Sequence, residues 1–526
     1  MVCLFSINRI IPRNGACLMY QKITVTSSVS NSTPQALAVT LFEGQDKLPA
    51  AYKILDKELG GSLADTVKRS EFAAATGKVT CVYPTSGASR VYIIGLGSRE
   101  SYRADSLRNG LGKLLLLLHE AKLTRVHMEL GPAFNGSVDH PRLGMLIGES
   151  FNLANFTFDS YKGVVNDSNK GKKLSLTVEV PKEQLKTAKS GLIIGDATNF
   201  ARTLAATPPN VANPDYIVKQ CKTMSRKVGL KCTVIDHKKA ATLGMGGLVA
   251  VGLGGSTPPS LICMEHKPAK TKANSKPILL VGKAVTFDTG GYSLKPGGGM
   301  GMKYDKCGGM AVIGAMQAIA ALNLNAHVVG LIPTAENMVD TVAYRPNDIV
   351  TFFNGVTAEV TNTDAEGRLI LADALAYGTK TYKPQAVIDL ATLTGGVVVA
   401  LGTFCAGAFV NDSNLHKQVF DAGEATGERL WRLPIWQEHR DMLKGIHSDL
   451  VNSCVGVRDA HPIQGAAFLS YFVGEDAPKQ LPTTPWAHLD IAGTSDNKED
   501  KMPFIKGPTG FGVRLLAEMV ANWKDI

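Results

Sequence analysis

The stretch NTDAEGRLIL, Asn362–Leu371, is the part of this chain from which its fold and chemistry are best inferred. It places two carboxylates, Asp364 and Glu366, one residue apart, and Arg368 follows two residues later. Alternate side chains of an extended segment share a face, so we expect these three to point the same way. Three charges on one face are costly unless a ligand or metal ion lies between them. A metal or ligand site and a surface turn with an Asp–Arg pair both fit this stretch.

The flanking sequence predicts a hairpin before these charges and a helix after them. Residues 348–363, DIVTFFNGVTAEVTNT, are rich in β-branched and apolar residues around one Asn-Gly turn, which is typical of a hairpin. Residues 368–380, RLILADALAYGTK, place apolar side chains at helical spacing. The charged stretch therefore lies where a strand gives way to a helix.

A second stretch has the same organisation. Residues 277–310, PILLVGKAVTFDTGGYSLKPGGGMGMKYDKCGGM, begin with an apolar strand, Ile278–Val281, which leads directly into Lys283. Glycine-rich turns follow, and glycine lets the backbone bend tightly near a ligand. An apolar helix is predicted over Met310–Leu322. The charged residues between strand and helix are Asp288, Lys295, Lys303 and Asp305.

Both stretches end a strand with carboxylates, and ligands of open α/β sheets bind at the carboxyl ends of strands. Four carboxylates gathered there would repel one another unless cations lay between them. Oxygen ligands with a bridging carboxylate suit a pair of divalent ions, such as Zn, Mn or Mg, about 3.5–4 Å apart.

At this point the sequence resembles the leucyl aminopeptidase family, the two-metal cytosol aminopeptidases. The resemblance is close over residues 190–526 and looser before them. It is specific because two long motifs occur together, whereas either fragment alone would be weak. Its motifs are NTDAEGRL, VGKxxTFDTGGxSLKP, MKYD, RTLAATPPNVANP (202–214), DLATLTG (389–395), WAHLDIAG (486–493) and PTGFGVRLL (508–516).

The resemblance assigns roles to these residues. One metal ion would be held by Lys283, Asp288, Asp305 and Glu366. The other would be held by Asp288, Asp364 and Glu366, with Asp364 also using its backbone oxygen. Lys295 would act as an electrophile, and Arg368 would bind a bicarbonate ion that carries a proton to the leaving amine. The substrate pocket would include Met302, Thr392, Leu393 and Gly395.

Several of these residues have a second interpretation. Lys283 can ligate a metal only as a neutral amine; otherwise it forms a salt bridge with the carboxylates. Met300 and Met302 fit either a pocket or core packing. Cys307 and His488 are expected to be a packed thiol and a strand hydrogen bonder rather than ligands. The segment from Lys295 to Asp305 is one residue shorter than the family pattern, and Gly301 stands where a polar residue is expected.

The chain is predicted to be an α/β protein of two domains. We expect an N-terminal extension over residues 1–20, an accessory α/β domain over 21–182, and a two-metal peptidase domain over 191–526. The larger domain alternates strands and helices, which predicts a mixed, mostly parallel sheet flanked by helices. Its predicted strands include GGLVAVGLG, residues 246–254, and a helix is predicted over Leu63–Thr76 in the accessory domain.

The first residues suggest an extension rather than a targeting signal. Residues 1–42 contain no Asp or Glu, but no apolar run typical of a signal peptide appears. Met19 precedes a predicted strand, which fits a start assigned upstream of the natural one. Nine scattered cysteines without a CxxC pair favour a reducing compartment, and we expect a cytoplasmic protein. No apolar run is long enough for a membrane span.

Charge is uneven along the chain. Residues 1–190 hold 24 Lys and Arg against 16 Asp and Glu, a net +8, while the whole chain is +10. A basic accessory domain could face nucleic acid. A solvated basic surface, such as VNDSNKGKK at residues 165–173, is the favoured interpretation.

The sequence thus predicts a metal-dependent aminopeptidase that releases apolar N-terminal residues, such as leucine, from peptides. The family resemblance implies a homohexamer. The alternatives are a two-metal hydrolase of another ester or amide, such as a phosphoester, and a DNA-binding regulator in which catalysis is secondary.

Overall fold

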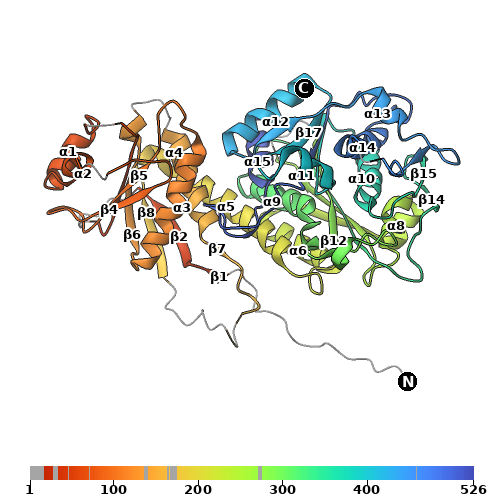
Figure 1. Ribbon diagram of the computed structural model, residues 1–526, viewed down its shortest axis with the longest axis horizontal. Coiled ribbons are helices and arrows are strands. Elements are labelled where there is room, and N and C mark those ends of the chain that lie inside the picture. The colour runs from red at the N-terminus through yellow and green to blue at the C-terminus, as the bar shows by residue number, and fades with distance from the viewer. Residues whose placement is uncertain are drawn as a thin grey trace. The chain divides into compact units, whose positions relative to one another are not determined.

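The computed structural model describes residues 17–27, 34–44, 47–69, 72–134, 140–162, 165, 174–269, 275–457 and 459–526. The predicted extension over residues 1–20 falls largely outside these ranges, as does the basic loop at 165–173 apart from Val165. The chain divides into two compact units (Figure 1). The N-terminal unit comprises residues 1–192 and 502–505, and the C-terminal unit comprises residues 193–501 and 506–526.

The N-terminal unit is built on a six-stranded sheet of order β2-β8-β6-β3-β5-β4, which is parallel except that β4 runs antiparallel to β5. Its core is the buried side chains of these strands and of the helices that pack on them. Figure 1 shows the strands between α1 and α2 on one side and α3 and α4 on the other. The elements are β1 (Cys17–Leu18), β2 (Tyr20–Thr26), β3 (Leu37–Leu41), α1 (Tyr52–Glu58), α2 (Ser62–Val67), β4 (Val79–Val82), β5 (Val91–Gly95), α3 (Ala104–Glu120), β6 (Arg125–Glu129), η1 (Gly131–Phe134), α4 (His140–Ala154), β7 (Phe156–Thr157), β8 (Leu174–Glu179) and η2 (Lys182–Gln184). Helix α5 (Leu185–Ala206) continues across the division between the units.

The C-terminal unit contains a mixed sheet of order β18-β17-β20-β16-β11-β13-β10-β9, with β12 also paired to β13. The central strands β20, β16, β11 and β13 are mutually parallel, so their carboxyl ends share one edge of the sheet. The elements are α6 (Pro214–Val228), β9 (Lys231–Asp236), α7 (His237–Thr242), α8 (Gly246–Gly252), β10 (Ser260–His266), β11 (Ile278–Gly282), β12 (Ala284–Asp288), η3 (Pro296–Gly299), η4 (Met302–Tyr304), α9 (Cys307–Ala321), β13 (Val328–Asn337), β14 (Ile349–Thr351), β15 (Thr357–Glu359), α10 (Glu366–Tyr382), β16 (Ala386–Ala391), α11 (Gly395–Leu401), β17 (Ala406–Val410), α12 (Ser413–Thr426), β18 (Leu430–Arg432), α13 (Gln437–Asp441), β19 (Leu450–Val451), α14 (His461–Leu469), η5 (Ser470–Phe472), β20 (Trp486–Asp490), β21 (Asp496–Asn497), β22 (Gly507–Pro508) and α15 (Val513–Ala521).

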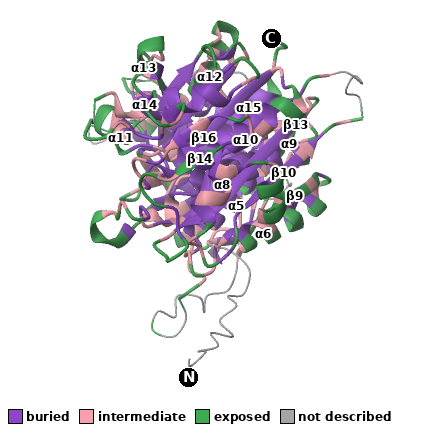
Figure 2. Ribbon diagram, turned by 90° about the vertical axis from the view of Figure 1, so that its right-hand side faces the viewer, coloured by how far each residue is buried: buried purple, intermediate pink, exposed green. Residues whose placement is uncertain are grey.

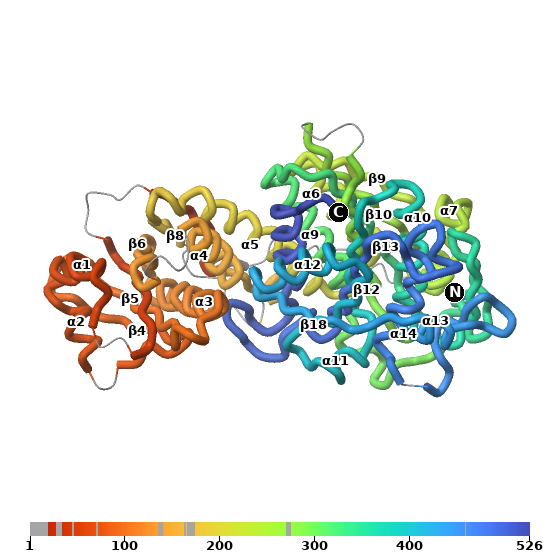
Figure 3. Tube along the Cα trace, turned by 90° about the horizontal axis from the view of Figure 1, so that it is seen from above, coloured from red at the N-terminus to blue at the C-terminus, as the bar shows by residue number. Residues whose placement is uncertain are grey.

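Helices α9 and α10 cover opposite faces of this sheet. Gly330 of β13 packs against Met316 of α9, whereas the next residue, Leu331, packs against Gly378 of α10. Successive strand residues point to opposite faces, so the two helices must lie on different sides. Figure 2 shows the buried residues running through these strands and helices. The C-terminal helix α15 lies beside α9 and α12 (Figure 3). A strand buried on both faces explains why Ile278–Val281 is uniformly apolar.

The α/β fold and the mixed sheet flanked by helices are confirmed, as is the hairpin, in which β14 pairs antiparallel with β15. Two local predictions were wrong. Residues 246–252 form helix α8 rather than a strand, because its amino end is fixed by the buried Asp373 carboxylate, which accepts a hydrogen bond of 2.8 Å from Leu248 N. The helix predicted over Leu63–Thr76 ends at Val67. No helix among the described residues is long and apolar enough to cross a membrane.

Candidate metal centre

The charged residues of both stretches meet at the edge where the parallel strands end. Lys283 follows β11, Asp288 ends β12, and Asp305 lies just before α9. Glu366 is the first residue of α10, and Asp364 lies in the turn before it. The prediction that residues 364–368 are extended was wrong. Since the helix begins at Glu366, Arg368 lies about 200° around its axis from Glu366 rather than beside it.

Two glycines make the close approach of these segments possible. Gly367 faces the side chain of Lys283, where an added Cβ would lie only 2.5 Å from Lys283 Cε. Gly290 has a φ of +87°, and a Cβ there would lie 2.4 Å from Ser293 O. A side chain at either position would push apart the elements that carry Lys283 and Asp288.

Three carboxylates form the centre of the cluster. Asp288, Asp305 and Glu366 each offer an oxygen atom, and these atoms lie within 4.8 Å of one another. Lys283 Nζ pairs with Asp305 Oδ1 at 2.8 Å and with Glu366 Oε1 at 2.9 Å. Lys295 Nζ pairs with Asp288 Oδ2 at 2.8 Å and also contacts Asp364 Oδ1. All five predicted ligands and Lys295 therefore lie in one cluster.

Burial and mutual charge shift the pKa values of these groups. Burial raises the pKa of Asp288 to about 6, with Glu366 adding to the effect and Lys295 and Lys283 opposing it. Burial likewise raises the pKa of Asp305 well above its ordinary value. For Glu366 the ammonium groups of Lys283 and Lys295 outweigh burial and lower the pKa.

For Lys283, burial and the neighbouring charges act on the pKa in opposite directions. Burial lowers the pKa of Lys283, but the carboxylates of Asp305 and Glu366 outweigh it, so the pKa is raised. The structure thus shows Lys283 in the salt bridge that the sequence offered as the alternative to a metal ligand. Lys283 Nζ also donates a hydrogen bond of 2.8 Å to the backbone oxygen of Thr392, so its ammonium group has three acceptors.

The donor set fits divalent cations. Four carboxyl groups surround two lysines in a mostly buried cluster, so acidic groups outnumber ammonium groups and divalent cations would offset the excess. Asp305 Oδ2 is buried and has no hydrogen-bond partner among the described residues, although Oδ1 of the same group accepts from both Lys283 and Thr392. A buried carboxyl oxygen without a protein partner is available as a metal ligand.

Sequence reasoning missed the residues that hold the cluster in place. Asn337 Nδ2 donates to Asp288 Oδ1 at 2.8 Å, and Gly290 N donates to the same oxygen. Asp490 accepts from Leu393 N and from Thr394 Oγ1, which fixes the loop that carries Thr392. Both residues are polar and end a parallel strand, β13 and β20, which is the signal that could have identified them.

Arg368 lies beside the cluster rather than in it. Its Nη1 donates to Asn452 O at 2.7 Å, and its buried Nε has no partner among the described residues. Burial lowers its pKa to about 10, which still leaves it positively charged at neutral pH. A buried guanidinium with an unused N–H suits a small carboxylate-like anion.

The predicted pocket residues differ in their positions. Thr392 reaches the cluster through its hydrogen bond to Asp305. Leu393 is half-buried, Gly395 is exposed at the start of α11, and Met302 is half-buried near Gly299. Met300 is 90% exposed, so the packing interpretation of this residue was wrong.

Cys307 and His488, which the sequence analysis did not expect to be ligands, contribute to packing and hydrogen bonding. Cys307 is buried, and burial raises its pKa to about 12, so it is a packed thiol. His488 lies within β20 with Nδ1 2.6 Å from Asp389 Oδ1. Neither residue belongs to the set of clustered oxygen ligands.

Comparison with known proteins agrees with this geometry. The catalytic-domain model of the cytosol aminopeptidase family matches residues 199–517, and the N-terminal-domain model of that family matches residues 38–164. The chain belongs to the cytosol aminopeptidase family. Membership makes it a metal-dependent hydrolase that acts on the amino-terminal residues of peptides.

Relatives in this family match nearly the whole chain. A probable cytosol aminopeptidase of Nitrosospira multiformis is 37% identical over 514 residues, covering 94% of this chain and 95% of the relative. One of Cenarchaeum symbiosum is 41% identical over 438 residues, covering 82% and 86%. The structure of the bottromycin maturation enzyme BotP in complex with Mn is similar with a TM-score of 0.80 and 31% identity, covering 93% of this chain and 99% of that one.

Proposed function

We propose that this cytosol aminopeptidase uses two divalent ions, Zn or Mn or Mg, to release leucine and other apolar N-terminal residues from peptides. The observation that carries the proposal is the mostly buried cluster of four carboxylates and two lysines, in which Asp305 Oδ2 has no partner among the described residues. One ion would be held by Lys283, Asp288, Asp305 and Glu366, and the other by Asp288, Asp364 and Glu366.

When bound, the two ions would supply an activated water and polarise the scissile carbonyl. The remaining roles belong to the side chains of this chain. The Lys295 ammonium, whose pKa is raised by Asp288, Glu366 and Asp364 against the effect of burial, stays charged and would stabilise the oxyanion that forms on that carbonyl. Lys283 would join the first ion as a neutral amine, which requires the loss of its proton beside the cations.

Arg368 would hold a bicarbonate ion for proton transfer. Support comes from its buried, unused Nε and from the absence of a His, Asp or Glu in the motifs that is free to act as a general base. Thr392, Leu393, Gly395 and Met302 would contact the substrate's first side chain.

We further propose a cytoplasmic homohexamer: the family name supports the location, and the assembly is what the family resemblance implies. Family membership favours peptides over phosphoesters as substrates. DNA binding by the basic N-terminal unit remains the less favoured proposal, since it rests on charge alone.

The test is hydrolysis of leucine p-nitroanilide by the full-length chain, stripped of metal and then restored with Mn²⁺ or Zn²⁺. Glu366→Gln is compared with Glu265→Gln, a control in the same sheet that pairs with His327 rather than with the cluster. We expect metal-dependent release that is lost in the first variant and kept in the second. The proposal would be refuted if a folded chain that binds two metal ions released no p-nitroaniline with Mn²⁺ or with Zn²⁺.

A further inference from the structure

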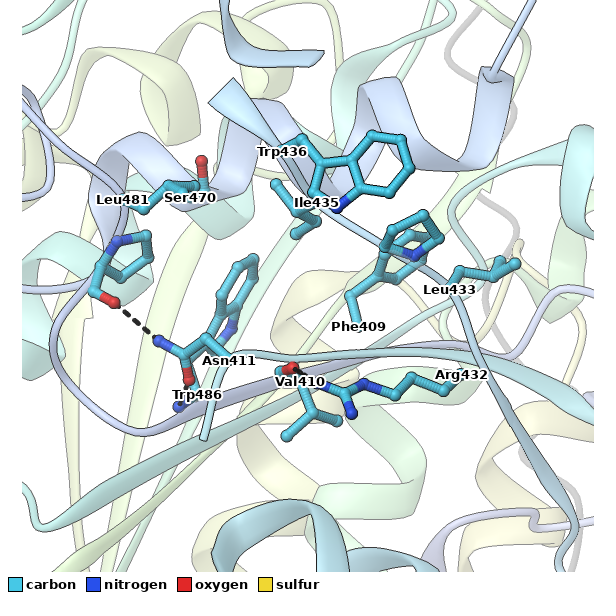
Figure 4. Close-up of a pocket in the computed structure, with 12 residues that line it drawn as sticks. Phe409, Val410, Asn411, Arg432, Leu433, Ile435, Trp436, Ser470, Leu481 and Trp486 are labelled. Atoms are coloured by element: carbon cyan, nitrogen blue, oxygen red, sulfur yellow. Dashed lines mark hydrogen bonds between the residues drawn. The ribbon is translucent and has the colours of Figure 1, made fainter. Parts of the chain in front are cut away.

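A cavity lies in the C-terminal unit, away from the carboxylate cluster. It has a volume of about 570 Å³ and lies where β17 and β18 end and β20 begins (Figure 4). Because β17 runs antiparallel to β20, these ends lie at the opposite edge of the sheet from Asp490 and the metal centre. Trp486 and Asp490 begin and end β20, which separates them by about 13 Å at ~3.3 Å per residue.

The walls of this cavity are largely apolar and aromatic. Phe409 and Trp486 come from the sheet, and Leu433, Ile435 and Trp436 come from the segment after β18 (Figure 4). Trp436 is 61% exposed although it is large and apolar. The volume is in the range of small-molecule sites, which are commonly lined in this way.

Most polar atoms of the cavity are already used by the fold. Asn411 donates to Pro482 O and Thr484 O and accepts from Trp486 N, so its amide is fully engaged. Ser470 Oγ donates to Ala467 O at 2.6 Å and accepts from Arg440 Nη1. The Trp486 indole N–H donates to Asp389. None of these three groups is available to select a ligand.

Two donors remain. Arg432 gives one N–H of Nη2 to Val410 O at 3.1 Å and makes no ion pair among the described residues. The Trp436 indole N–H has no hydrogen-bond partner in the described part of the chain. No Asp or Glu lines the cavity. The site therefore offers N–H donors and one positive charge, and nothing that would pair with an ammonium group.

We propose that this cavity binds a small apolar carboxylate that carries no ammonium group, such as an aryl-alkanoic or branched aliphatic acid. The carboxylate pairs with Arg432, and the apolar body packs against Trp436 and the partly buried Leu433 and Ile435 beside it. A free amino acid, the product of the established activity, binds poorly because its ammonium group finds no partner. The inference is independent of the proposed two-metal mechanism, since no residue of the cavity belongs to the metal centre.

The test measures binding of 3-phenylpropionate to the full-length chain by titration calorimetry, with and without added Mn²⁺. The uncharged 3-phenylpropanamide and the cationic 3-phenylpropylamine serve as matched probes. We expect the carboxylate to bind at least tenfold more tightly than either, and equally with and without metal. Arg432→Met should weaken its binding at least tenfold without changing hydrolysis of leucine p-nitroanilide.

The control is Arg226→Met, which removes an exposed arginine on α6 that also donates to a backbone carbonyl, Lys222 O, but lies outside the cavity. It should bind the probe like the wild type. Trp436→Ala, at an exposed position, provides a second variant and should also weaken binding. Equal binding of the three probes, no binding of 3-phenylpropionate, or unchanged binding by Arg432→Met would overturn the proposal. A change in assembly state on Trp436→Ala without a change in probe binding would instead assign the cavity to a contact between copies.

Discussion

Asp389 and Asp305 are buried carboxyl groups of the same unit, and their surroundings differ in one respect. Asp389 uses both oxygens: Oδ1 lies 2.6 Å from His488 Nδ1, and Oδ2 accepts from Trp486 Nε1 at 2.7 Å. Asp305 uses Oδ1 twice, and its Oδ2 is buried without a partner among the described residues. A buried carboxylate whose two oxygens both accept hydrogen bonds from the protein stabilises the fold. One with an oxygen that accepts none is available to a ligand.

The largest effect should come from Asp305→Asn. This change removes a charged oxygen ligand but nearly conserves volume, so we expect kcat/KM for leucine p-nitroanilide to fall at least about 1000-fold, equivalent to ~4 kcal/mol. The chain should remain folded, as shown by an unchanged circular dichroism spectrum. Activity within about tenfold of wild type would contradict the assignment of Asp305 as a ligand.

Asp389→Ala should have the converse effect. Two buried donors, on His488 and Trp486, lose their acceptor, so we expect the free energy of unfolding to fall by about 3 kcal/mol. The kcat per folded molecule should change little, because Asp389 contacts none of the predicted ligands. Denaturant unfolding and active-site titration would separate the two quantities. A stable but inactive variant would place Asp389 in the catalytic machinery.

Thr392→Val should have a smaller effect. It removes the hydroxyl that donates to Asp305 Oδ1 but keeps the backbone carbonyl that accepts from Lys283. Loss of an orienting hydrogen bond to a ligand typically costs about 10-fold or more, and we expect about a 10-fold decrease in metal affinity. Thr394→Val is the matched control for general loop effects, since its hydroxyl donates to Asp490 rather than to a predicted ligand. Equal effects of the two variants would show that Thr392 acts only through loop stability.

The smallest effect concerns pH. Burial lowers the pKa of His488, but the Asp389 carboxylate outweighs burial, so the folded pKa is raised above the ordinary value of 6.5. This group therefore stabilises the fold fully below pH 6.5, and its contribution is lost as pH rises through the folded pKa. The difference in unfolding free energy between wild type and His488→Gln, measured from pH 5 to 9, should be greatest at the acidic end. A difference that grows with pH would reverse the sign of the pKa shift.

The sequence predicted which charged residues come together better than it predicted the local backbone. Lys283, Asp288 and Asp305 could be assigned to one site because parallel strands bring their carboxyl ends together. The helix start at Glu366 was missed because NTDAEG contains turn-forming residues that fit either an extended segment or a cap. Residues 246–252 contain valine and glycine, whose local preference is opposed to a helix. Only the distant Asp373, which fixes the amino end of α8, shows why a helix forms there.

Asn337 and Asp490 could not be ranked from the sequence for a different reason. Their importance depends on strand pairing, which places each at the end of a strand near the cluster. The cavity beside Arg432 was also invisible, since its lining comes from segments between residues 409 and 486 that meet only in the folded chain.

The central claim is that the carboxylates of Asp288, Asp305, Asp364 and Glu366, with Lys283, bind two divalent ions. Its most direct test is a calorimetric Mn²⁺ titration of the metal-free, full-length chain, with Asp305→Asn and Asp389→Asn measured alongside. The account predicts two ions per chain for the wild type and for Asp389→Asn, and one tightly bound ion for Asp305→Asn. Two equally tight ions in Asp305→Asn, or none in the folded wild type, would contradict it.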